Sequence, residues 1–127
     1  MKIHAPLRLF DSSKLLSWLI ATKVAERIKN DPAAVARMEI EIASWQGDPS
    51  RTLALRTWSR LVKLDPREIA VRLLADNHEG ELARDTMPRT IVPDLSKPED
   101  RKELLRERSR MEQDGEVAYG WGEPSPT

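Results

Sequence analysis

The stretch that decides the fold runs from Asp31 to Leu74, DPAAVARMEIEIASWQGDPSRTLALRTWSRLVKLDPREIAVRLL, and contains Asp-Pro pairs at 31–32, 48–49 and 65–66. An Asp side chain accepts hydrogen bonds from the free N–H groups of a first helical turn. Pro is tolerated at the first helical position because its missing N–H would have had no partner there. Each pair therefore predicts the start of a helix. The residues that follow the pairs do not match one another, which favours three helices of similar length over a repeat.

Apolar residues recur at helical spacing in these three helices and in the segment before them. Steps of three and four residues place such side chains on one helical face. The four stripes are Leu16, Ile20, Val24 and Ile28; Val35, Met38, Ile42 and Trp45; Ala54, Trp58, Leu61 and Val62; and Ile69, Ala70, Leu73 and Leu74. Turns of only two or three residues join the helices, so neighbours should pack side by side and roughly antiparallel.

The second half of the chain has a different composition. Residues 77–84 can form a further short helix, while Pro88 and Pro93 predict an extended linker. Ser96 and Glu99 match a capping box at the start of a last helix, which has few apolar residues and many charges. Gly, Pro and acidic residues dominate the remaining segment and predict a flexible tail.

The predicted fold is all-α. We expect an N-terminal arm over residues 1–11, a compact bundle of four to five short helices over 12–84 and the Pro-containing linker over 85–97. A charged C-terminal helix over 98–112 and a flexible tail over 113–127 complete the chain. Apolar residues alternate in the arm as they do in a strand, but no other segment offers it an obvious partner strand. It could lie over the bundle or add to the sheet of a partner.

Composition limits the classes of function. The sequence has 21 basic and 21 acidic residues, so no overall field attracts nucleic acid or anionic membranes. Only 39% of the residues are apolar, which favours either marginal stability or a face completed by a partner. Cysteine is absent, which suits a cytoplasmic protein, and the longest uncharged apolar run, Leu15 to Ala21, is too short to span a membrane.

The sequence contains no pattern typical of an active site. A Gly-rich phosphate loop, a His-x-x-x-His zinc helix and a Gly-x-Ser-x-Gly elbow are all missing. The two histidines, His4 and His78, are too isolated to predict a metal site. We therefore expect no catalytic residue, no metal and no cofactor, and interpret the chain as a non-enzymatic interaction protein.

The C-terminal region is the predicted surface for a protein partner. A helix with so few apolar residues is weakly held by its own protein and could become ordered on binding. The tail carries two aromatic residues, which are costly to expose unless they dock on the bundle or on a partner. The residues predicted to bind the partner are Arg101, Leu104, Leu105, Arg108, Tyr119 and Trp121.

A second hypothesis is that the chain binds DNA. Arg56, Arg60 and Lys63 follow one another at steps of four and three residues, so they share one helical face. Consecutive helices joined by a tight turn also permit a helix-turn-helix, although the chain has no net positive charge. The sequence leaves open nucleic acid as a further partner and a homo-oligomer as the assembled form.

Part of the chain resembles a known class of proteins. The resemblance covers roughly residues 20 to 108 and is to small helical bacterial proteins of the antitoxin type, which are encoded beside toxins. It is carried by short motifs at 73–76, 82–84, 87–88 and 96–101, together with Val92. Arg89 departs from the pattern, because an aromatic residue commonly follows the linker proline in that class. The resemblance implies that the chain binds and neutralises a bacterial toxin, and that it could also repress transcription.

Overall fold

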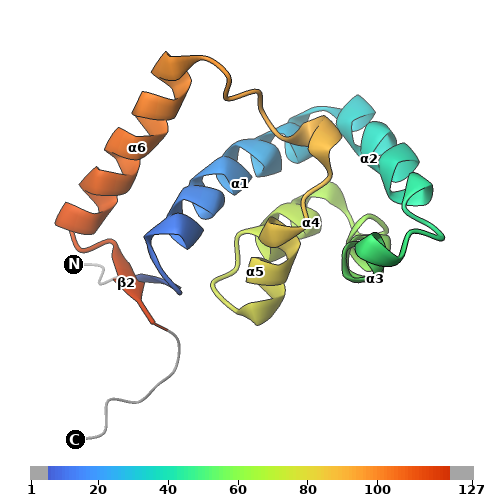
Figure 1. Ribbon diagram of the computed structural model, residues 1–127, viewed down its shortest axis with the longest axis horizontal. Coiled ribbons are helices and arrows are strands. Elements are labelled where there is room, and N and C mark those ends of the chain that lie inside the picture. Colours follow the sequence, from blue (N-terminus) through green and yellow to red (C-terminus); the bar gives the residue numbers. More distant parts are fainter. Residues whose placement is uncertain (1–5, 121–127) are drawn as a thin grey trace, which may run out of the picture.

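The computed structural model describes residues 6–120 and is mostly helical (Figure 1). The helices are α1 (Ser12–Asn30), α2 (Pro32–Ser44), α3 (Thr52–Leu61), α4 (Pro66–Leu73), α5 (His78–Asp85) and α6 (Pro98–Gln113). Two 3-10 turns, η1 (Pro49–Arg51) and η2 (Arg89–Ile91), lie in the connections. Two short strands, β1 (Leu7–Leu9) and β2 (Val117–Tyr119), form a small sheet. The all-α prediction is confirmed, with this sheet as an addition.

The three Asp-Pro pairs begin helical segments, as predicted. The Asp31 carboxylate accepts a hydrogen bond from the backbone N–H of Ala33 at 3.0 Å, and α2 starts at Pro32. The third pair starts α4 in the same way. The second pair differs, because Asp48 caps the 3-10 turn η1 and α3 begins only at Thr52.

The helix α1 lies at the centre of the molecule, with α6 on one side and α2 to α5 on the other (Figure 1). Towards the start of α1, Leu15 and Leu19 pack in a small cluster with Leu9, Leu104 and Met111. This cluster attaches the sheet and α6 to the rest of the protein. Because α1 is covered on more than one side, a single predicted stripe cannot describe its burial.

The larger cluster lies towards the other end of α1. Val24 and Ile28 are buried there as predicted, while Leu16 and Ile20 are only half-buried. Trp58 of α3 is fully buried in this cluster, and its Nε1 donates a 3.1 Å hydrogen bond to the hydroxyl of Thr86. The indole thus contributes a large apolar area and keeps its one donor satisfied.

The N-terminal arm has a partner strand within the chain, contrary to the prediction. Strands β1 and β2 are parallel, with Leu7 opposite Val117 and Leu9 opposite Tyr119. The loop after α6 returns the chain to the start of α1, and the burial of Leu9 holds the pair in place. The segment from 117 to 119 is therefore a strand, which corrects the prediction of a flexible tail over that part. The tail residues 121–127 lie outside the described residues.

The predicted capping box at the start of α6 is wrong. Lys97 is the N-cap residue and makes no side-chain cap hydrogen bond. The reason is that Pro98 takes the first helical position, which leaves Ser96 one residue too early to cap the helix. Ser96 instead donates its backbone N–H to the Asp94 carboxylate at 2.9 Å.

Candidate functional site

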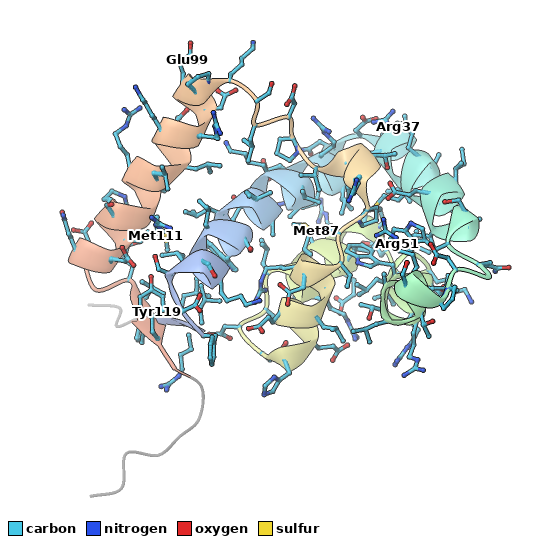
Figure 2. All side chains as sticks on the ribbon, viewed as in Figure 1. Arg37, Arg51, Met87, Glu99, Met111 and Tyr119 are labelled. Atoms are coloured by element: carbon cyan, nitrogen blue, oxygen red, sulfur yellow. The ribbon has the colours of Figure 1, made fainter. Side chains whose placement is uncertain are left out.

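The helix α6 is attached to the molecule along one face. Its main packing neighbours are α1 and β2, and Figure 1 shows it forming one side of the protein. Leu104 and Met111 are the buried residues of α6, and in Figure 2 Met111 lies on the side facing α1. The opposite side is exposed to solvent.

The outer face of α6, which we define as Lys102, Leu105, Arg106 and Ser109, combines an apolar side chain with positive charge. Leu105 is 41% exposed, and all the other members are also exposed. Within residues 6–120, the side chains of Lys102 and Arg106 make no hydrogen bond or ion pair. The face therefore presents an apolar side chain bordered by two cations without an ion-pair partner.

In the second half of α6, the cation Arg110 is paired with carboxylates, unlike the cations of the outer face. Arg110 contacts Glu107 at 2.5 Å, Asp114 at 2.9 Å and Glu116 at 2.7 Å. The hydrogen bond from Arg110 holds the pKa of Glu107 below its usual value. This network connects the end of α6 to the loop before β2 and neutralises the cation. The unpaired positive charge of the helix is thus concentrated towards its start.

The residues that the sequence predicts to bind a partner do not lie on one surface in the structure. Leu105 lies on the outer face, whereas Leu104 is only 5% exposed and packs against α1. Arg101 is exposed, but its position three residues before Leu104 places it on the side of that residue. Arg108 is half-buried, and its Nε is buried without a hydrogen-bond partner in the described chain. Leu104 therefore holds α6 in position, and its neighbour Leu105 is available to a partner.

The aromatic residue of β2 docks on the protein itself. Tyr119 is 40% exposed, and its hydroxyl donates a hydrogen bond to the Glu112 carboxylate of α6. Partial burial and this carboxylate raise the pKa of Tyr119, while a hydrogen bond with Ser12 and the charge of Arg108 lower it. Tyr119 thus joins β2 to α6. The predicted contact residue Trp121 lies outside the described residues.

Sequence reasoning does not single out Lys102 and Arg106 as site residues. Both are visible in the sequence as part of a dense run of charge. The signal that distinguishes them is their spacing of four residues around Leu105, together with the absence of a paired carboxylate. That second property needs the structure, because Glu103 is a close neighbour in sequence but forms no ion pair with either cation within residues 6–120.

The predicted DNA-binding residues also lie on one exposed surface. Arg56 and Arg60 belong to α3, and Lys63 follows it in the turn before α4. All three are exposed, and in the described chain none of them makes an ion pair or a side-chain hydrogen bond. No Asp or Glu occurs between residues 49 and 64. Nearby Arg51 lies over the Trp45 ring, 5.5 Å from its centroid, and is engaged there.

The described chain gives no sign of a metal centre or a membrane span. Between residues 6 and 120, no group of three or more His, Cys, Asp or Glu side chains could hold a metal ion. The helices in the same range all lack the length or the apolar character needed to cross a membrane. His78 is exposed, and His4 lies outside the described residues. Searches against known protein families, curated proteins and solved structures found no match to this chain.

Proposed function

We propose that this chain is a non-enzymatic protein-interaction module that binds an acidic segment of a partner through the outer face of α6. The observation that supports the proposal is the exposed Leu105 beside the unpaired cations Lys102 and Arg106. When a partner covers a partially exposed leucine, apolar surface is removed from water, and this burial stabilises the complex. The surrounding cations select a partner of opposite charge and speed its association.

The nature of the partner follows from the resemblance to antitoxin-type proteins. A protein of that kind binds a bacterial toxin in the cytoplasm and blocks its action. The outer face of α6 suits this task, because a helix that is already formed can bind in a groove without reordering the rest of the fold. The partner is therefore a toxin whose binding groove carries carboxylates around an apolar pocket.

Affinity purification with matched variants tests this proposal. The tagged protein is expressed in its own host, and a partner that co-elutes in stoichiometric amount is identified by mass spectrometry. We expect the double variant Lys102→Glu, Arg106→Glu to lose this partner, because the reversed charges repel an acidic segment. The double variant Arg56→Glu, Arg60→Glu carries the same change in net charge on α3 and should keep it.

Two further results complete the test. Co-expression of the captured protein with the wild-type chain should restore growth if the partner is a toxin, and the α6 variant should fail to restore it. The proposal is wrong if the α6 variant retains the partner as well as the wild type does. It is equally wrong if no stoichiometric partner co-elutes.

DNA binding by α3 is a second candidate function, favoured by the unpaired state of Arg56, Arg60 and Lys63. Cations at helical spacing can contact successive phosphates, and the absence of carboxylates from 49 to 64 leaves their charge uncompensated. Replacing all three with Ala should remove binding to DNA from the upstream region of the gene in a gel-shift assay. It should also reduce the salt dependence of any residual binding. Unchanged binding by the triple variant would rule this function out.

A further inference from the structure

A pocket of about 310 Å³ lies where α3, α4 and α5 meet. This volume is at the lower end of the range of roughly 300–1,000 Å³ that is usual for small-ligand sites. Its apolar wall consists of Leu61, Leu64, Leu82 and Ala83, of which Leu61 and Ala83 are buried. An apolar group of about the size of one ring would cover this wall.

The polar side chains of the pocket differ in whether they already have a hydrogen-bond or ion-pair partner. Arg60 and Thr57 of α3 lie three residues apart, and neither side chain makes a hydrogen bond or ion pair within residues 6–120. Across the pocket, Arg72 is already engaged, because Glu68 lies 3.0 Å and Glu79 lies 3.6 Å from its guanidinium. The two polar side chains that have no partner are therefore both on the α3 side of the pocket.

The pocket carries a positive excess on that same side. Its lining contains the cations Arg60 and Arg72 and a single carboxylate, Glu79. An anionic ligand is repelled by Glu79 and attracted by Arg60, so its charge should lie against α3 with its apolar part towards Leu82. One free guanidinium and one hydroxyl match the two oxygens of a carboxylate. A phosphate would need more donors and would leave the apolar wall uncovered.

We propose that this pocket is a binding site for a small amphipathic carboxylate, held by Arg60 and Thr57 at its charged end and by the leucines at its apolar end. The site is separate from the outer face of α6, so its existence does not depend on the function proposed above. Arg60 also belongs to the exposed basic residues of α3. A bound carboxylate would therefore neutralise part of that basic surface.

The test uses 4-phenylbutanoate as the probe and the full-length protein, with binding followed by NMR titration. We expect a saturable one-to-one complex in which the signals of residues 57–64 and 79–83 shift. Arg60→Gln should weaken binding about tenfold, as expected for the loss of a charged hydrogen bond. Arg56 lies one turn earlier on α3, outside the pocket lining. The Arg56→Gln variant should therefore bind the probe as the wild type does.

The neutral analogue 4-phenylbutanamide separates charge recognition from simple apolar binding. It should bind about tenfold more weakly than the acid, since Arg60 would face an uncharged oxygen. Thr57→Val, which keeps the shape of the side chain, should also weaken binding of the acid. The proposal is overturned if the titration does not saturate, if acid and amide bind equally, or if Arg60→Gln binds the acid as the wild type does.

Discussion

Gly80 lies so close to Ala75 that a Cβ atom at position 80 would stand 2.1 Å from the Ala75 carbonyl oxygen. The same carbonyl accepts a 2.8 Å hydrogen bond from Nη1 of Arg84, which also donates to the Leu73 carbonyl at 2.8 Å. The buried guanidinium thus satisfies two carbonyls at the end of α4 and holds α5 against it. Gly80 permits the close approach that this arrangement needs.

Gly80→Ala should destabilise the protein although it raises helix propensity. In an open helix this change would stabilise by about 1 kcal/mol. Here the added methyl group must displace backbone, and we expect a net loss of about 1–3 kcal/mol. Urea unfolding measures the difference. Glu79→Ala, at the exposed neighbouring position, should stay within about 0.5 kcal/mol of the wild type, and an equally stable Gly80→Ala would disprove the close packing.

The adjacent residues Leu104 and Leu105 should respond very differently to truncation. Leu104→Ala leaves a cavity between α6 and α1 and should cost about 2–4 kcal/mol. Leu105→Ala removes a half-exposed side chain and should cost less than about 1 kcal/mol. Limited trypsin digestion provides a second measurement, because α6 is rich in Lys and Arg and a loosened helix is cleaved faster. Equal effects of the two changes would contradict the orientation of α6 described above.

The hydrogen bond between Trp58 and Thr86 should contribute to the stability of the protein, and removing its acceptor should lower the free energy of unfolding. Thr86→Val keeps the volume of the side chain but leaves the buried indole N–H without an acceptor. The expected cost is about 1–3 kcal/mol in the free energy of unfolding. Thr90→Val serves as the control, since the Thr90 side chain is exposed and makes no hydrogen bond in the described chain. A Thr86→Val variant as stable as this control would show that the bond contributes nothing.

The cap of α1 should contribute stability that depends on pH. The Ser13 hydroxyl and the backbone N–H of Lys14 donate to the Asp11 carboxylate, and these bonds lower the pKa of Asp11 below 3.8. A lowered pKa means that the contribution is present above pH 3.8 and is lost as the pH falls through the folded-state pKa. Asp11→Ala should therefore reduce the Tm at pH 7, with a difference from wild type that shrinks in acid. A difference independent of pH would count against the charged cap.

The helices are predictable from the sequence because their signals are local. Asp31 and Asp65 cap the helices that follow them, and the apolar steps in α2 and α4 indicate the buried faces of these two helices. The pairing of β1 with β2 is different, since Leu7 and Val117 are separated by almost the whole chain. Each strand has only three residues, so its own pattern carries little information. Only the path of α6 along α1 brings the two strands together.

The candidate surface is predictable in part. The charged character of α6 is plain in the sequence, and Leu105 lies on its outer face. The sequence does not reveal which of Leu104 and Leu105 faces α1, because a helix with so few apolar residues has no clear stripe. The same holds for the pocket beside Arg60, whose wall combines side chains from three helices. Both depend on how the helices pack.

Hydrogen–deuterium exchange on the complex with the co-purified partner tests the central claim most directly. Because α6 is attached mainly through Leu104 and Met111, its amides should exchange through local opening in the free protein. A partner on the outer face opposes this opening, so we predict slower exchange across 101–109 and little change in α3. Slowing confined to α3, with α6 unaffected, would contradict the assignment of the partner surface to α6.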